Sequence, residues 1–190
     1  MNFLSFPGGW ARTTTACRRL AVTIVFVTLS AATTTTRAQS YAPGQRLQSG
    51  GPEHDSFGHS VALDGDTLIV GAPDYKVGAN SRQGSAFIFI RSGITWTLQA
   101  QLFTDDGAMG DAFGSSVAIS GNTALIGAPD DSVGGNSLQG SAYVFTRSGT
   151  TWTLQQNLTA SNGAAYDHFG QSLAIFGDTV MVGSSSAVGT

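Results

Sequence analysis

The sequence predicts an all-β fold built from the four-stranded blades of a β-propeller. The first observation is compositional: the 190 residues include 25 glycines and only 11% charged residues, which is typical of turn-rich sheets rather than of solvated helices. The second is a hydrophobic content of 41%, close to that of globular proteins. The third is an internal repeat with a period of 56 residues and no helical pattern between its apolar runs.

Residues 1–38 are expected to be a secretory signal sequence. Three arginines in residues 1–19 precede the uncharged 13-residue stretch 20–32, and small side chains at positions 36 and 38 suit cleavage after Ala38. A membrane span needs about 20 apolar residues, so the stretch is short for one. An uncleaved anchor and an organelle transit peptide are the alternatives. We therefore expect a secreted or cell-surface protein with no membrane span in the mature chain.

The charge of the remaining chain excludes a nucleic-acid-binding protein. Beyond residue 38 there are 5 basic and 12 acidic residues, a net charge of −7. Such a surface repels a phosphate backbone. The one cysteine, Cys17, lies in the signal, so the mature chain is expected to contain no disulfide and no thiol site.

The repeat divides the chain into units. Residues 55–110 and 111–166 align without a gap and are identical at 32 of 56 positions. Residues 167–190 begin a third, shortened unit, which matches the first at 10 of its first 17 positions. Residues 39–54 are then a lead-in to the first repeat.

Each full repeat is expected to hold four short strands, at 60–63, 67–71, 85–91 and 94–102 in the first. An Asp-Gly turn between the first two strands is a strong hairpin signal, and Pro73 ends the second strand. The third run is apolar on both faces, as in a buried strand. The fourth alternates, which places one set of side chains on a single face: Ile94, Trp96, Leu98, Ala100 and Leu102.

Four antiparallel strands recurring every 56 residues indicate propeller blades, with a β-solenoid as the alternative. Residues 39–190 span 152 residues, or 2.7 periods. The smallest propellers have about four blades. We therefore expect an incomplete propeller, from a truncated chain or from one that needs further blades in cis or self-assembly to close.

Two short motifs recur in register with the repeat. The first motif is Phe-Gly and the second is Gly-Ala-Pro. The first motif consists of Phe57 and Gly58, Phe113 and Gly114, and Phe169 and Gly170 in the three repeats. The second consists of Gly71, Ala72 and Pro73 in the first repeat and Gly127, Ala128 and Pro129 in the second. This pattern resembles the FG-GAP repeat, which builds the β-propeller head of integrin α subunits. The third repeat departs from it, with Gly183-Ser184-Ser185 at the second motif. The resemblance implies an extracellular propeller, usually of seven blades, that serves adhesion or ligand binding through its loops.

The resemblance also raises the question of calcium, because several integrin-like blades carry a D-x-D-x-D-G loop between the two motifs. Here the corresponding turns, around 64–66, 120–122 and 176–178, hold at most two carboxylates each. We therefore expect no metal and no other cofactor. Solvated loops are also expected at the two remaining acidic clusters, Asp105, Asp106 and Asp111, and Asp130 with Asp131.

No enzymatic activity is expected. The three histidines, His54, His59 and His168, occupy unrelated positions in the repeat, and neither a G-x-S-x-G nor an H-x-x-x-H motif is present. The expected role is non-catalytic binding or adhesion toward an unknown extracellular protein or glycan. An accessory repeat region of an extracellular hydrolase or lyase, and a purely structural repeat, are the alternatives.

The long loops 74–84 and 130–140 are expected to project from one rim, because equivalent segments of every blade share a face. Their candidate contact residues are Asp74, Asn80, Asp130 and Asn136. Asn157 begins an N-glycosylation sequon that only a eukaryotic host would use, and it lies in an expected strand.

The signal assignment can be tested directly. Expression of the full chain in a secreting host should release a protein whose N-terminal residue is Gln39, because cleavage follows Ala38. N-terminal sequencing of the released protein measures this. Retention of residues 1–38 on the protein would contradict the assignment.

Overall fold

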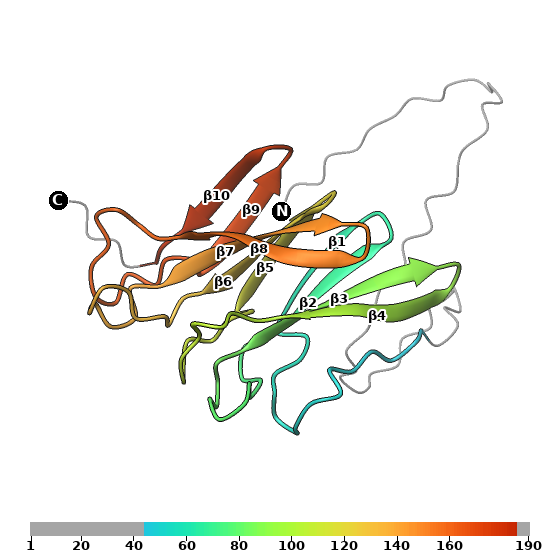
Figure 1. The fold of residues 1–190 in the computed structure, drawn as a ribbon, viewed down its shortest axis with the longest axis horizontal. Helices are drawn as coiled ribbons and strands as arrows, with labels where there is room; N and C mark the ends of the chain where they lie inside the picture. Colours follow the sequence, from blue (N-terminus) through green and yellow to red (C-terminus); the bar gives the residue numbers. More distant parts are fainter. Residues whose placement is uncertain (1–43, 186–190) are drawn as a thin grey trace, which may run out of the picture. The chain divides into compact units, whose positions relative to one another are not determined.

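The computed structural model of the protein describes residues 44–185; residues 1–43, which include the expected signal, and residues 186–190 lie outside this part. Residues 44–185 form no helix, and therefore none long and apolar enough to cross a membrane. Residues 45–185 belong to one compact unit (Figure 1). The strands are β1 (Ser60–Asp64), β2 (Thr67–Ala72), β3 (Ser85–Ser92), β4 (Thr95–Leu102), β5 (Ser116–Ser120), β6 (Thr123–Ala128), β7 (Ser141–Ser148), β8 (Thr151–Leu158), β9 (Ser172–Phe176) and β10 (Thr179–Gly183).

These strands form three antiparallel sheets in chain order. Blade 1 consists of β1-β2-β3-β4, blade 2 of β5-β6-β7-β8, and half-blade 3 of β9-β10. The described sheets do not close into a ring. The predicted all-β fold of incomplete propeller blades is therefore confirmed, and the ends of the strands expected in the first repeat lie within one residue of those in the structure.

The first hairpin of each blade is set by a glycine. Asp64 pairs with Thr67, which leaves a two-residue loop that starts at Gly65. Gly65 has a φ of 56°, and its equivalents Gly121 and Gly177 have φ values of 56° and 55°. Two-residue hairpins favour positive φ because it matches the twist of the flanking strands, and glycine adopts it without steric cost.

The regular alternation predicted for the fourth strand is wrong. Ile88 of β3 pairs with Ala100, but the next residue, Phe89, pairs with Leu98. Gln99 is therefore an extra residue, a β-bulge in β4. Blade 2 repeats the same irregularity one period later.

The bulge exchanges the two faces of β4 part-way along the strand, because side chains alternate with a period of exactly two only in a regular strand. Trp96, before the bulge, is buried against one face of blade 1. Ala100 and Leu102, after it, pack against the opposite face. Leu98 and Ile94 are exposed. The five apolar residues of this strand therefore do not share one face.

The largest apolar core lies between blades 1 and 2. Blade 1 contributes Ile69 and Ile88, and blade 2 contributes Phe113, Tyr143 and Trp152 to the same buried cluster. Within blade 2, the centroids of the Phe113 and Tyr143 rings lie 5.4 Å apart. Complete burial of one such side chain is worth roughly 1.5–3 kcal/mol. The blades are thus held together by the stacking of their faces.

The two repeated motifs meet at the boundary between blades. The Gly114 carbonyl, in the Phe-Gly turn that precedes β5, lies against Gly71 of β2 and accepts a hydrogen bond of 2.7 Å from Ser60 Oγ of β1. A Cβ at Gly71 would overlap this carbonyl oxygen. Within blade 2, the Gly114 amide donates to the Gly127 carbonyl at 2.9 Å. The glycines of both motifs therefore permit a close approach of two backbones.

The same arrangement joins blade 2 to half-blade 3. Ser116 Oγ donates to the Gly170 carbonyl at 2.6 Å, and that carbonyl lies against Gly127. The remaining motif residues lie around these contacts: Ala72, Pro73, Ala128 and Pro129 are buried, and Phe57 and Phe169 are half-buried.

Backbone hydrogen bonds add a short ladder between blades. Phe113 N donates to Gln83 O at 2.9 Å, and Ala112 N donates to Arg82 O at 3.0 Å. One repeat later, Phe169 N donates to Gln139 O at 2.8 Å. The segment before each Phe-Gly turn is thereby fixed to the segment before β3 or β7 of the preceding blade.

Replacement of Gly71 by alanine should destabilise the protein by about 1–3 kcal/mol, because the new methyl group overlaps the Gly114 carbonyl in a packed interface. Urea unfolding followed by circular dichroism measures the loss.

Gly183→Ala is the matched control. Gly183 occupies the same repeat position, but the one close contact of an added Cβ there is with the Ser172 hydroxyl, which can rotate away, and the Ser172 backbone oxygen lies at an ordinary contact distance. We expect little loss of stability in dilute solution. Equal destabilisation by the two substitutions would contradict the role assigned to Gly71.

Candidate functional site

Three long connections gather at one end of the strands. They are residues 73–84 between β2 and β3, 103–115 between β4 and β5, and 129–140 between β6 and β7. Figure 1 shows them at the end opposite the short hairpins β1–β2, β3–β4 and β7–β8. We call these three connections the rim. It contains both long loops that the sequence singles out.

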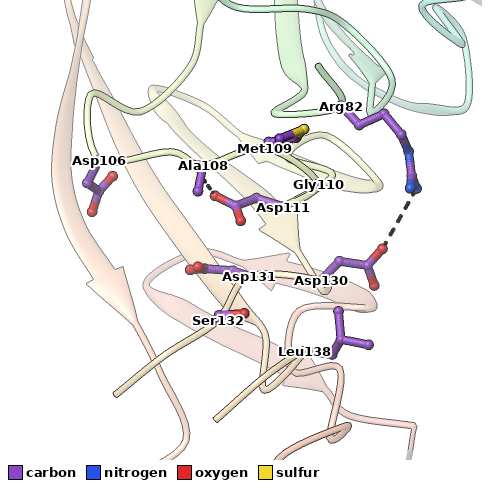
Figure 2. Close-up of a pocket in the computed structure, with 10 residues that line it drawn as sticks. All are labelled: Arg82, Asp106, Ala108, Met109, Gly110, Asp111, Asp130, Asp131, Ser132 and Leu138. Atoms are coloured by element: carbon purple, nitrogen blue, oxygen red, sulfur yellow. Dashed lines mark hydrogen bonds and ion pairs between the residues drawn. The ribbon is translucent and has the colours of Figure 1, made fainter. Parts of the chain in front are cut away.

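The rim encloses an open pocket of about 520 Å³ (Figure 2). Side chains from all three connections surround it. Four of these side chains carry a carboxylate, and one carries a guanidinium. The ten lining residues are Arg82, Asp106, Ala108, Met109, Gly110, Asp111, Asp130, Asp131, Ser132 and Leu138. The pocket therefore carries an excess of negative charge. It brings together the two acidic clusters that are far apart in the sequence.

Asp111 is the most buried of the four carboxylates. Its Oδ2 accepts a hydrogen bond of 2.6 Å from the Ala108 amide, which closes a tight turn in the β4–β5 connection. Burial raises the pKa of Asp111 above its ordinary value of 3.8, and the nearby charge of Asp131 raises it further, against the opposing effect of the Ala108 hydrogen bond. Asp167 makes the same contact with the Ala164 amide at 2.7 Å. This aspartate is therefore a recurring structural element.

Asp131 is held by two hydroxyl groups of β7. Its Oδ2 accepts hydrogen bonds from Ser141 Oγ at 2.6 Å and from the Tyr143 hydroxyl at 3.2 Å. Burial raises the pKa of the Tyr143 hydroxyl well above its ordinary value, so the group stays a proton donor. Tyr75 occupies the equivalent position in blade 1. The Asp131 carboxylate is thus particular to the second repeat.

A line of polar contacts runs along the rim across repeat boundaries. Asp74 accepts hydrogen bonds from Ser56 Oγ at 2.5 Å and from Arg82 Nε at 2.9 Å, and these two contacts lower the pKa of Asp74. Figure 2 shows the Arg82 side chain pointing toward Asp130, with Nη2 and Oδ2 3.9 Å apart. The other Asp130 oxygen lies 3.2 Å from His168 Nδ1. Solvent-accessible pairs of this kind are each worth about 1 kcal/mol or less.

Asn80 and Asn136 use their side chains within the fold. Asn80 Nδ2 donates to Gln83 Oε1 at 3.1 Å and to the Gly107 carbonyl at 2.9 Å. Asn136 makes the equivalent contacts with Gln139 and the Gly163 carbonyl, at 2.8 and 3.2 Å. Both amides thereby tie a long loop to the connection that leads to the next blade. Of the four candidate contact residues, Asp74 and Asp130 are the ones whose side chains lie along the open rim.

The described residues contain no group of three or more His, Cys, Asp or Glu side chains arranged to hold a metal ion. The hairpin carboxylates instead contact protein groups. Asp64 Oδ2 accepts a hydrogen bond of 2.5 Å from the Gly121 amide of the next blade, and Asp66 pairs with Arg91 at 2.7 Å. Asn157, the glycosylation candidate, is exposed on β8.

Sequence reasoning did not single out Arg82. It lies opposite Asp130 only because adjacent blades stack their loops side by side. A comparison of the two repeats could have indicated Arg82, because the equivalent position in the second repeat holds the uncharged Leu138. Asp131 shows the same signal, but its contacts with Ser141 and Tyr143 depend on the fold.

The family comparison agrees with this architecture. The FG-GAP repeat model matches residues 47–89, 96–145 and 152–189, which together exceed half of the chain. The chain belongs to the FG-GAP repeat family. Comparison with curated proteins finds no match. The FG-GAP segments cover both full blades and half-blade 3, so the protein is a β-propeller-like repeat module.

The raised pKa of Asp111 leads to a test of its role in the FG-GAP module. Asp111→Asn keeps an oxygen that can accept from the Ala108 amide, so stability at neutral pH should change little. Asp111→Ala leaves that amide without its partner and should lower the free energy of unfolding by about 1–3 kcal/mol. Urea unfolding of the two variants measures the free energy of unfolding of each.

The contribution of Asp111 to the free energy of unfolding depends on pH in a defined direction. A pKa that is higher in the folded state means that protonation of Asp111 favours folding; this stabilisation is fully present below pH 3.8 and is lost as pH rises through the folded-state pKa. NMR titration should therefore place the pKa of Asp111 above 3.8 and that of Asp74 below it. The reverse order would contradict the assigned environments.

Proposed function

We propose that this FG-GAP protein is a secreted or cell-surface, non-catalytic module that binds an extracellular partner at its rim. The observation that carries the proposal is the pocket lined by Asp106, Asp111, Asp130 and Asp131 between three loops of successive repeats. Binding residues are often carried by loops that a rigid scaffold holds in place. The blades supply that scaffold.

The chemistry of the pocket favours a basic segment of an extracellular protein. Its four carboxylates outnumber the single guanidinium of Arg82. Met109, which is highly exposed at the pocket, offers an apolar surface to the methylene stem of a lysine or arginine. None of the ten lining residues is aromatic, so the pocket lacks the ring on which a sugar would stack. These features favour a protein over a glycan.

The proposed extracellular location has support in the sequence. The order of basic, apolar and small residues in 1–38 is that of a secretory signal. The net charge of −7 beyond residue 38 would favour association with a basic partner through electrostatic attraction. That attraction should weaken with salt, because the screening length is about 8 Å at physiological ionic strength.

The absence of catalysis is part of the same proposal. His168 and Asp130 lie in contact on the rim, at 3.2 Å, as two members of a hydrolytic triad would. Among the described residues, no serine or cysteine forms a hydrogen bond with His168 to complete a nucleophile–base pair. We assign the pair the role of fixing the third repeat to the second.

The experiment begins with an array of extracellular proteins and glycans probed with the purified chain. Affinity for a selected lysine- or arginine-rich peptide is then measured by fluorescence anisotropy. Asp106→Asn should weaken binding about twofold to fivefold, because one exposed charge contact is worth ~0.5–1 kcal/mol. Arg82→Gln should strengthen binding, since it removes the one cation of the pocket.

Asp105→Asn is the matched control, because Asp105 is the sequence neighbour of Asp106 but does not line the pocket. It should leave the affinity nearly unchanged. Equal effects of the two asparagine substitutions would show that overall charge, and not the pocket, governs binding. Selective capture of neutral glycans with no basic protein would also reject the proposal.

A further inference from the structure

The carboxylates of the rim pocket differ in whether a cation already lies beside them. Asp130 lies 3.9 Å from Arg82 Nη2 and 3.2 Å from His168 Nδ1. Figure 2 shows the Asp130 carboxylate turned toward Arg82, with the carboxylates of Asp111 and Asp131 away from that pair. In the described part of the chain, neither of these two aspartates forms an ion pair. Their negative charge is therefore not neutralised within the fold.

Asp111 is buried and yet keeps one oxygen for a further contact. The residue is 7% exposed and lines the pocket. Its Oδ2 accepts the Ala108 hydrogen bond, whereas its Oδ1 has no hydrogen-bond partner among residues 44–185. Burial and the charges of Asp131 and Asp106 raise the pKa of Asp111. A cation at Oδ1 would supply the partner that this buried charge lacks.

Asp131 divides its two oxygens in the same way. Oδ2 accepts from Ser141 Oγ and from the Tyr143 hydroxyl, and Oδ1 accepts from no described residue. Ser132 lines the same pocket, and its exposed hydroxyl forms no hydrogen bond within residues 44–185. The pocket thus offers one oxygen from each of two carboxylates, together with one hydroxyl oxygen.

The first repeat does not offer this arrangement. Asp55 is the equivalent of Asp111, but both of its oxygens are occupied, Oδ1 by the Phe57 amide at 3.0 Å and Oδ2 by Ser49 Oγ. Tyr75 stands where the second repeat has its second carboxylate. The pair of carboxylates with one oxygen each to offer is therefore particular to the second repeat. The repeat fold forms without it.

Lysine and arginine side chains use such oxygens differently. A guanidinium gains most from the two oxygens of one carboxylate, which it binds as a rigid fork. An ammonium has three N–H donors that can reach separate acceptors. Neither Asp111 nor Asp131 has two oxygens to offer. Asp106 has both, but it is exposed, where an ion pair contributes little to affinity.

We propose that the rim pocket is a lysine site, in which the ammonium of a partner's lysine binds Asp111 Oδ1 and Asp131 Oδ1 in preference to an arginine. The Ser132 hydroxyl supplies the third acceptor. The lysine preference rests on the function proposed above and names the side chain of the partner that enters the pocket. Arg82 stays beside Asp130 when the lysine binds, so the two cations occupy opposite sides of the pocket.

Two labelled peptides of equal charge, hexalysine and hexaarginine, test the preference by fluorescence anisotropy with the purified chain. Hexalysine should bind about threefold to tenfold more tightly, because the guanidinium cannot form its second hydrogen bond to the same carboxylate. Asp131→Asn should weaken hexalysine binding more than hexaarginine binding, since the ammonium loses one of its two charged acceptors. Asp105→Asn, outside the pocket, should leave both affinities nearly unchanged.

A second variant should reverse the preference. Ser141→Ala with Tyr143→Phe removes the two hydroxyl groups that occupy Asp131 Oδ2, so both oxygens become available to a guanidinium. Hexaarginine should then bind more tightly than to the wild-type chain, while the affinity for hexalysine should change little. Circular dichroism reports whether the variant folds. If it does not, the comparison of the two peptides on Asp131→Asn decides.

NMR titration locates the bound lysine. A cation beside Oδ1 favours the ionised carboxylate, so saturating hexalysine should lower the pKa of Asp111. Asp74 does not line the pocket, and its pKa should not change. An unchanged pKa of Asp111 in the saturated complex would place the lysine elsewhere and overturn the assignment.

The outcomes distinguish failure of the lysine preference from failure of the proposed function. Equal affinities, or tighter binding of hexaarginine to the wild-type chain, would reject the preference. If Asp106→Asn still weakens both peptides in that case, the acidic rim remains a binding site for basic segments. Failure of both peptides to bind would reject the lysine site together with the proposed function.

Discussion

The close approach of two backbones, the Gly114 carbonyl against Gly71, is the constraint on which the rest of the structure depends. A side chain at Gly71 would hold the blades apart and separate the Ser60 hydroxyl from its acceptor. Because the same contact recurs between Gly127 and Gly170, both blade boundaries have the same spacing. The two halves of the repeated motif are thus the two sides of one interface, supplied by successive repeats.

That spacing accounts for both the core and the rim. With the backbones this close, the faces of adjacent sheets meet, and the Phe113 ring, which contacts Tyr143 and Phe145 of its own blade, is buried in the same cluster as Ile69 and Ile88 of blade 1. The same stacking places the loop of one repeat beside the loop of the next, so that Arg82 and Asp130 come within reach of each other. A pocket with lining residues from three connections follows from the interface, and the function proposed for it depends on that geometry.

The 56-residue period was sufficient to predict the strands, because the apolar runs and the Asp-Gly turns recur in register. It did not reveal the bulge at Gln99, since nothing in the side-chain type marks an extra residue in a strand. Nor did it show that Asp111 is buried or that Asn80 points inward, because both depend on backbone groups brought near by folding. A repeat thus predicts what recurs within one unit. Contacts between units, including most of the candidate site, require the arrangement of the blades.

Native-state hydrogen exchange of the Phe113 amide tests this account most directly. That amide donates to the Gln83 carbonyl across the blade boundary, next to the glycine contact. If the interface holds the blades together, its exchange should require global unfolding, at the free energy measured for amides in the central strands β2 and β6. Exchange at a much lower free energy, while those strands remain protected, would show that the boundary opens by itself and would contradict the central role of the contact.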